Sequence, residues 1–345
     1  MSQEVLALSR EVSEIATQRM KEIQRITART HILSLNAMIE ARRVGEQGLG
    51  FAFVANEMKE ISAAINNISK TLESEMAERT LQLNELWSDT LTLVRGARLA
   101  DIALNMIDIV DRNLYERSCD VRWWATDSAV VACLQNPDAS AARHASKRLA
   151  VILSSYTVYV DLWVVDRNGM VIANGRPEQY PTAIGTNVAR ASWFQQAIAT
   201  RSGEEFAVAD VQRNVELGHQ PVAIYSAAIR REGEVDGEKL GVLGIFFNWA
   251  PQANAVVDSV RLDAEEKSRT RALLVDAAGL VLAASDRKGE LSEIISLETT
   301  SGATGSYVTR QGQLVGYAKT PGYETYAGLG WYGILIENNP ALLTA

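Results

Sequence analysis

The chain contains no proline before Pro137, and only four of its 23 glycines lie within the first 100 residues. Proline breaks a helix and glycine weakens one, so this composition is typical of long, uninterrupted helices. Three of these four glycines lie within six residues, at Gly45, Gly48 and Gly50. We therefore predict a helical hairpin over residues 1–95 that turns at residues 45–50.

A heptad pattern of apolar residues runs along the second arm of this hairpin. Its positions are three or four residues apart, and they are Val54, Met58, Ile61, Ile65, Ile68, Leu72 and Met76. This spacing places the side chains on one face of a helix that packs against other helices. A single hairpin would leave apolar surface exposed. We therefore expect a homodimer in which two hairpins form a four-helix bundle.

Helices continue after the hairpin. Gly96 is the one residue between positions 51 and 137 that would weaken a helix. We expect a long helix from about Ala52 to about Leu134, bent or interrupted near Gly96. A second helix fits residues 141–155, because a turn sequence, Asn-Pro-Asp, precedes it.

The remaining sequence contains an internal repeat. Residues 165–173 (VDRNGMVIA) match residues 275–283 (VDAAGLVLA). Each copy is typical of a strand, an Asp-x-x-Gly turn that begins at Asp166 or Asp276, and a second strand. Further strand-like segments follow each copy, so we predict one α+β module that occurs twice.

These patterns divide the chain into four parts. The predicted fold class is an all-α coiled-coil hairpin at residues 1–95, followed by a long stalk helix and two α+β lobes. The stalk helices occupy residues 96–150. The first lobe occupies residues 151–255, and the second occupies residues 256–345.

Composition and motifs argue against several functions. The chain has 34 basic and 42 acidic residues, and it lacks the basic stripe of a nucleic-acid-binding protein. Its three histidines lie in different segments without metal-ligand spacing, and no nucleophile motif is present. We therefore expect no enzyme, no catalytic residue, no cofactor and no metal.

Cys119 and Cys133 are too few for a disulfide framework, and we expect both to be reduced.

No apolar stretch reaches the ~20 residues that a membrane span requires. The N-terminus is charged from its fourth residue and lacks the apolar core of a signal peptide. We therefore expect a soluble, cytoplasmic protein.

Residues 26–55 carry a specific resemblance. Their sequence, ITARTHILSLNAMIEARRVGEQGLGFAFVA, resembles the signalling tip of methyl-accepting chemotaxis proteins, including the Gly-Glu-Gln-Gly turn. In that family the tip docks a chemotaxis histidine kinase and its SH3-like coupling protein. The resemblance implies that these two proteins are partners. Carried over by position, the interface residues are Leu33, Asn36, Arg43, Glu46 and Phe51.

The rest of the chain, about residues 97–337, resembles the double Cache sensor, in which a stalk helix carries two PAS-like lobes. The shared features are the two Asp-x-x-Gly turns, the Trp193-Phe194 pair and the closing segment at residues 328–331. The resemblance implies that the first lobe binds a small ligand in a pocket at this pair. The candidate ligand-binding residues are Trp193, Phe194, Arg190, Asp210, Tyr225 and Phe246.

Two of these positions bear on the class of ligand. Amino-acid-binding sensors of this family have an arginine two residues before the Trp-aromatic pair and an aspartate on the last strand. Here Ala191 and Phe246 hold those positions. The charged partners of an α-amino acid are therefore missing, and we expect a planar or weakly charged ligand other than a standard α-amino acid.

Together these features predict a chemoreceptor-like signal transducer in which the signalling hairpin comes first and the sensor last. Ligand binding in the first lobe would control the kinase through the hairpin tip. The alternative is a dimeric small-molecule-binding sensor whose hairpin is only a dimerisation stalk, without kinase coupling.

Overall fold

The structure is a computed structural model that describes residues 2–299 and 302–338. The chain forms two compact units, Met1–Arg95 and Gly96–Ala345. The boundary between them lies within helix α2 (Leu49–Trp124). No helix in the described part of the chain is long and apolar enough to cross a membrane.

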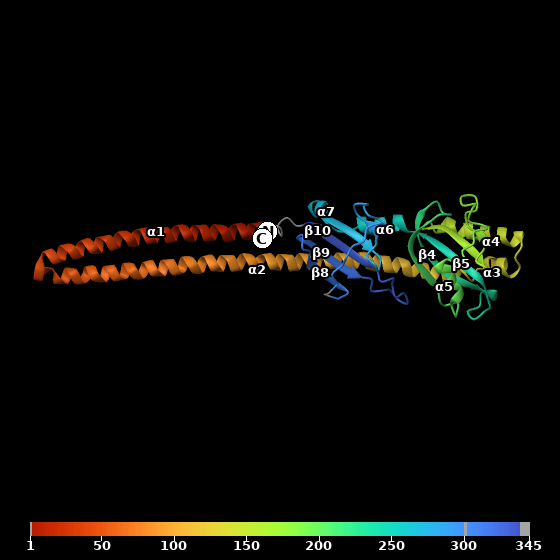
Figure 1. Cartoon of the computed structure of the whole chain (residues 1–345), viewed down its shortest axis with the longest axis horizontal. Helices are drawn as coiled ribbons and strands as arrows, with labels where there is room; N and C mark the ends of the chain where they lie inside the picture. Colours follow the sequence, from red (N-terminus) through yellow and green to blue (C-terminus); the bar gives the residue numbers. More distant parts are fainter. Residues whose placement is uncertain (1, 300–301, 339–345) are drawn as a thin grey trace. The chain divides into compact units, whose positions relative to one another are not determined.

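The first unit is the predicted hairpin. Helix α1 (Ser2–Arg43) leads through the short 3-10 helix η1 (Gly45–Gly48) into α2, which runs back along it (Figure 1). Gly45 has a positive φ of 71°, which glycine adopts without the steric cost that other residues incur. At Gly48 a Cβ atom would collide with the carbonyl of Ala41, so only glycine allows this close turn.

Small and polar residues form the contact between the two arms. Gln24 Nε2 on α1 donates to Glu73 Oε2 on α2 at 3.3 Å. The side chains buried between the arms recur at heptad spacing, and they are Met20, Thr27, Ser34, Ala41, Ala55, Ser62 and Ser69. Five of the larger apolar residues of the heptad pattern on α2 stay exposed, and they are Val54, Ile61, Ile65, Ile68 and Leu72. These exposed side chains, called the apolar seam below, are thus available to pack against another surface.

Three helices start the second unit: the last part of α2, then α3 (Ser128–Gln135) and α4 (Ala139–Ser155). The expected continuation of α2 to Leu134 is wrong. The helix ends at Trp124, and Asp127 caps α3 by accepting a hydrogen bond from Ala129 N. The expected break near Gly96 is also absent. Gly96 instead allows Ser306 to pack directly against the helix.

Two five-stranded antiparallel sheets follow. The first has the order β2-β1-β5-β4-β3 and consists of β1 (Tyr159–Asp166), β2 (Val171–Asn174), β3 (Ala207–Asn214), β4 (Gln220–Arg230) and β5 (Lys239–Asn248). The second has the order β7-β6-β10-β9-β8 and consists of β6 (Thr270–Val275), β7 (Val281–Ala284), β8 (Thr304–Val308), β9 (Gln313–Lys319) and β10 (Tyr332–Asn338). Helix α5 (Ser192–Ala199) and η2 (Arg231–Gly233) belong to the first lobe, and α6 (Trp249–Asp258) and α7 (Ala264–Arg269) lead into the second.

The structure confirms the internal repeat. Trp163 pairs with Asn174 in the first sheet, and Leu273 pairs with Ala284 in the second at the equivalent position. In both turns an aspartate side chain accepts hydrogen bonds from the backbone N–H groups two and four residues later. The Asp-x-x-Gly sequence therefore builds the same hairpin twice, and both aspartates are structural.

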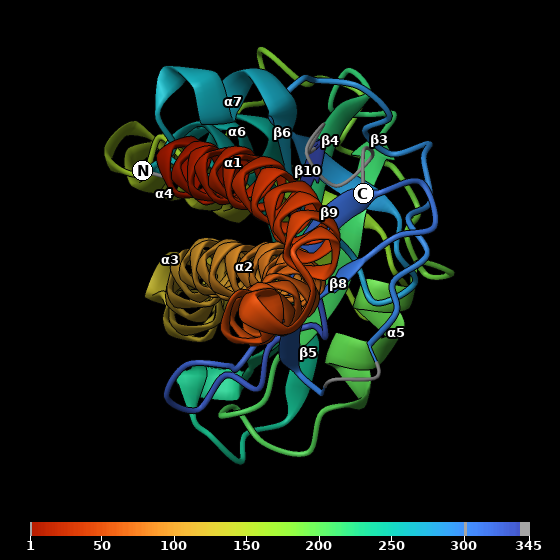
Figure 2. The same ribbon diagram turned by 90° about the vertical axis from the view of Figure 1, so that its left-hand side faces the viewer.

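Each face of the first sheet contributes to a different core. One face packs with α2, α3, α4 and α6 in a large cluster that also reaches the second lobe. The other face packs against α5 and the segment before it in a smaller cluster. Figure 2 shows α3 and α4 on the opposite side of these strands from α5.

Candidate functional sites

The hairpin tip exposes both polar and apolar side chains. Arg43, at the end of α1, lies 3.7 Å from Glu40, and both side chains are largely exposed. Glu46 lies on η1 and faces solvent. Phe51, in the first turn of α2, is 76% exposed. An aromatic ring this exposed beside unburied charges is typical of a surface that binds a partner.

All five candidate interface residues are exposed. Leu33 and Asn36 lie on α1, one turn apart, and Arg43, Glu46 and Phe51 surround the turn. Sequence reasoning left out several neighbours that are equally exposed. These neighbours are large apolar residues near the turn that the contact between the arms leaves exposed, which is the feature by which the sequence could have indicated them. They are Ile32, Ile39, Val44, Leu49 and Phe53.

In the first lobe, three of the candidate ligand-binding residues meet. Trp193 and Phe194 lie on α5, and Phe246 lies on β5. The ring centroids of Trp193 and Phe246 are 5.9 Å apart, and those of Trp193 and Phe194 are 6.3 Å apart. Trp163 on β1 completes this aromatic cluster, 4.2 Å from Phe246. All four rings are buried, so in this conformation they pack against one another.

The prediction that Tyr225 and Asp210 share a cavity with Trp193 is wrong. Side chains alternate between the faces of a strand, and Tyr225 points to the stalk side of the sheet. There its hydroxyl lies 3.0 Å from that of Tyr326 in the second lobe. Asp210 Oδ1 accepts a hydrogen bond from Trp331 Nε1, also in the second lobe, at 2.9 Å. Both residues therefore join the lobes.

Arg190 precedes α5 and is exposed. It lies three residues from Trp193 but contributes no side chain to the buried aromatic cluster.

Sequence reasoning missed two residues beside the aromatic cluster. Trp163 lies two residues before Val165 on β1, and the alternation of that strand could have placed it on the α5 face. Asp161 is fully buried on the same strand. Its two carboxylate oxygens accept hydrogen bonds from Leu162 N, Trp163 Nε1, Asn174 Nδ2, Gly175 N and Arg176 N. Burial raises the pKa of the Asp161 carboxyl, and these donors act in the opposite direction.

The described residues contain no group of three or more histidine, cysteine, aspartate or glutamate side chains that could hold a metal ion. Cys133 is buried, and burial raises the pKa of its thiol to about 11, so at neutral pH it is protonated.

Comparison with known proteins agrees with this organisation. Residues 1–108 match the model of the methyl-accepting chemotaxis protein (MCP) signalling domain. The described lobes of the second unit have the fold of Cache-like chemoreceptor sensor domains. Residues 1–108 are thus similar to an MCP signalling domain, and the second unit shares the fold of Cache-like domains.

Two of the matching relatives show the extent of the sequence similarity. The toxin coregulated pilus biosynthesis protein I of Vibrio cholerae is 32% identical over 108 residues, which are 30% of this chain and 17% of that protein. Methyl-accepting chemotaxis protein IV of Escherichia coli is 32% identical over 114 residues, 31% of this chain and 20% of that protein. The chain therefore spans about a fifth or less of the length of these relatives.

One of the matching solved structures has a similar fold. The ligand-binding domain of the Pseudomonas aeruginosa amino acid chemoreceptor PctC, in complex with GABA, aligns with a TM-score of 0.53. It is 17% identical, and the alignment covers 71% of this chain and 100% of that domain. This likeness shows a shared fold.

Proposed function

We propose that this protein is a chemoreceptor-like transducer that senses a small ligand through its C-terminal sensor and controls a chemotaxis histidine kinase through its hairpin tip. The observation that carries the proposal is the exposed tip of an MCP signalling domain on the same chain as a sensor fold. The role is signalling rather than catalysis. It requires the tip to share the cytoplasm with the kinase.

The proposed ligand site lies on the α5 face of the first lobe. Trp193, Phe194 and Phe246 offer aromatic surface there, and Arg190 lies at the start of α5. Because these rings fill the space between α5 and the sheet, ligand entry requires α5 to move outward. The PctC domain, which shares the fold, was solved with GABA bound. Since Ala191 and Phe246 provide no charge for an α-amino acid, a planar or weakly charged ligand fits better.

The proposed output interface combines charge and apolar surface. Arg43 and Glu46 supply polar contacts on either side of the turn, and Leu33 and Phe51 supply apolar ones. Asn36 adds an amide that can donate and accept hydrogen bonds. The partners are a chemotaxis histidine kinase and its coupling protein.

The test is association of the full chain with the kinase and coupling protein, measured by pull-down and kinase activity. Glu46→Ala and Arg43→Ala should each weaken association by roughly tenfold, as truncation of an interface hot spot does. The matched control is Glu85→Ala, an exposed carboxylate on α2. Its position is 39 residues from Glu46, roughly 58 Å along a helix at 1.5 Å per residue.

Unchanged association in the tip variants would contradict kinase coupling. It would favour the alternative, a dimeric small-molecule-binding sensor with the hairpin as its stalk. Circular dichroism and light scattering should show the same helix content and the same assembly for all three variants, because every substituted side chain is exposed.

A further inference from the structure

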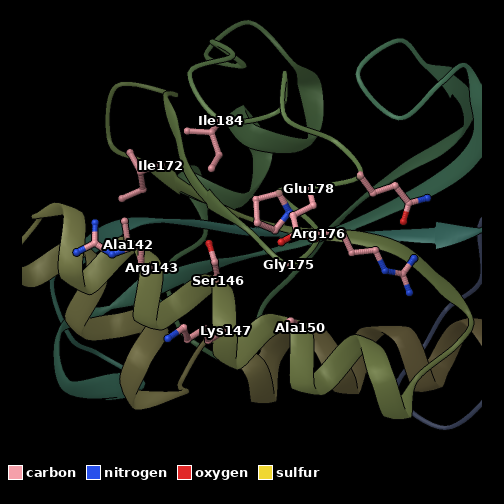
Figure 3. Close-up of a pocket in the computed structure, with 12 residues that line it drawn as sticks. Ala142, Arg143, Ser146, Lys147, Ala150, Ile172, Gly175, Arg176, Glu178 and Ile184 are labelled. Atoms are coloured by element: carbon pink, nitrogen blue, oxygen red, sulfur yellow. The ribbon is translucent and has the colours of Figure 1, made fainter.

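A groove of about 760 Å³ lies on the first lobe, between α4 and the segment that contains β2 and the residues after it. Its volume is within the ~300–1,000 Å³ range of small-molecule sites. Figure 3 shows Arg143, Ser146, Lys147 and Ala150 along α4 on one side of the groove. Ile172 and Ile184 lie across from them.

The groove is separate from the aromatic cluster. Ile172 packs with the core on the stalk side of the sheet, whereas Trp193 and Phe246 pack with the core on the α5 side. Helix α4 and helix α5 lie on opposite sides of the first-lobe strands (Figure 2). A molecule in the groove would therefore touch none of the proposed ligand-binding rings.

Part of the groove wall is apolar and open to solvent. Ile184 is 45% exposed, and Ile172 is half-buried. Ala142, Ala150 and Pro177 add small apolar surfaces between them. Covering this wall with a hydrocarbon or aromatic body would remove apolar area from water, which is favourable.

The charged part of the wall is cationic. Arg143 and Lys147 are four residues apart on α4, so their side chains emerge from the same face and can reach one anion. Arg143 also interacts electrostatically with Asp138, the N-cap residue of α4, which is not part of the groove wall. Arg176 adds a third cation, although its Nη1 donates to Val160 O at 2.8 Å.

Glu178 is the one carboxylate among the lining residues. The groove thus carries an excess of positive charge on a chain whose net charge is −8. This local reversal of sign favours an anion.

From this combination we infer that the groove binds an organic anion with an apolar body. The acidic group faces Arg143 and Lys147, and the body lies on Ile172, Ile184 and Ala150. Ser146 offers a hydroxyl in the same wall, and Gln179 offers an amide whose Nε2 also donates to the Tyr180 hydroxyl at 3.0 Å. This site goes beyond the proposed function, because it lies apart from both the aromatic cluster and the tip.

The probe is 2-naphthoate, compared with its neutral analogue 2-naphthamide, in equilibrium dialysis against the full chain. Naphthoate should bind saturably at one site per chain, at least about tenfold more tightly than the amide. Arg143→Glu combined with Lys147→Glu should weaken naphthoate binding by about tenfold or more. Ala150→Trp should do the same by filling the groove, since Ala150 is exposed and tolerates a larger side chain.

Two matched controls separate the groove from general effects of charge and bulk. Arg201→Glu reverses an exposed cation of the same lobe outside the groove, and Val151→Trp adds the same ring at the next position of α4, 55% exposed. Both should leave affinity within about twofold of the unmodified chain. If the double charge reversal perturbs folding, Lys147→Ala takes its place, with a smaller loss expected.

Equal binding of naphthoate and naphthamide would overturn the inference. So would absence of saturable naphthoate binding, or unchanged affinity in both groove variants. None of these outcomes affects kinase association, which the tip variants measure independently.

Discussion

At the scale of single residues, the Asp161 side chain is held by a dense set of hydrogen bonds. Five N–H donors converge on its two oxygens, and the side chain is fully buried. The donors come from β1, from β2 and from the residues that leave β2. The carboxylate therefore ties the edge strand to its neighbour beside the aromatic cluster.

Asp161→Asn should destabilise the protein by about 2–4 kcal/mol, because an amide replaces one acceptor oxygen with an NH₂ group that faces N–H donors. The measurement is the shift in the denaturant concentration at which half of the second unit is unfolded. The matched control is Asp166→Asn, where Oδ1 accepts from Asn168 N and Met170 N in an exposed turn. That change should cost less than about 1 kcal/mol, because asparagine also favours such turns. Similar losses in the two variants would contradict this account of Asp161.

Sequence patterns located residues well where local chemistry decides the structure. Asp166 and Asp276 were predicted as turn residues, and both accept the expected backbone hydrogen bonds. The positions of Tyr225 and Asp210 could not be read in this way. They depend on which face of the sheet meets the second lobe, and this is a property of packing between distant segments.

At the scale of elements, buried tyrosines contribute to the contact between the lobes. The hydroxyls of Tyr225 on β4 and Tyr326 after β9 lie 3.0 Å apart, and both rings are buried. Phe206 stacks against each of them, with centroid distances of 6.2 Å and 6.4 Å. Burial raises the pKa of both tyrosines, so they remain neutral and share a hydroxyl–hydroxyl hydrogen bond.

Tyr326→Phe should destabilise the second unit by about 1–3 kcal/mol, because it leaves the buried Tyr225 hydroxyl without its partner. Tyr225→Phe should cost a similar amount. The double variant should cost less than the sum of the two, because no buried hydroxyl then lacks a partner. Thermal or denaturant unfolding provides the four values of this double-mutant cycle.

The control for this cycle is Tyr323→Phe. Tyr323 contacts Tyr115 edge to face through its ring, at 5.4 Å between centroids, and this contact survives the loss of the hydroxyl. It should therefore change stability little. Strict additivity of the Tyr225 and Tyr326 variants would show that the hydroxyls act independently.

At the scale of the whole molecule, the hairpin leaves an apolar seam uncovered. Ile61, Ile65 and Ile68 are 56%, 39% and 66% exposed. Farther along the arms, Leu8 and Val12 of α1 border a groove of about 450 Å³ with Leu72 and Met76 of α2. Apolar side chains repeated along two helices are the surface that a second hairpin covers in a four-helix bundle.

We therefore expect the chain to form a homodimer, and Ile61→Asp combined with Ile65→Asp to give monomers, because the seam cannot solvate two charges. Light scattering over a range of concentrations measures the mass. The control, Ala63→Asp combined with Asn67→Asp, adds two carboxylates to a different face of the same helix turns and should remain dimeric. A monomer at all concentrations for the unmodified chain would contradict the prediction.

The sequence by itself determined the kind of structure in each region. The absence of proline and the heptad spacing specified long helices, the three glycines specified their turn, and the repeated Asp-x-x-Gly motif specified two equivalent lobes. These signals are local, because helix propensity, turn chemistry and periodicity act over a few residues.

Only the tertiary structure decided which faces meet. It placed small residues such as Ser34 and Ser62 between the arms and left the isoleucines outside. It filled the expected ligand pocket with Trp163, and it assigned Tyr225 and Asp210 to the contact between lobes. Such outcomes depend on close packing between segments far apart in sequence, where side-chain volume and hydrogen-bond partners must be satisfied together. Packing between distant segments produces no repeating pattern of residues along the sequence, so the sequence alone does not reveal it.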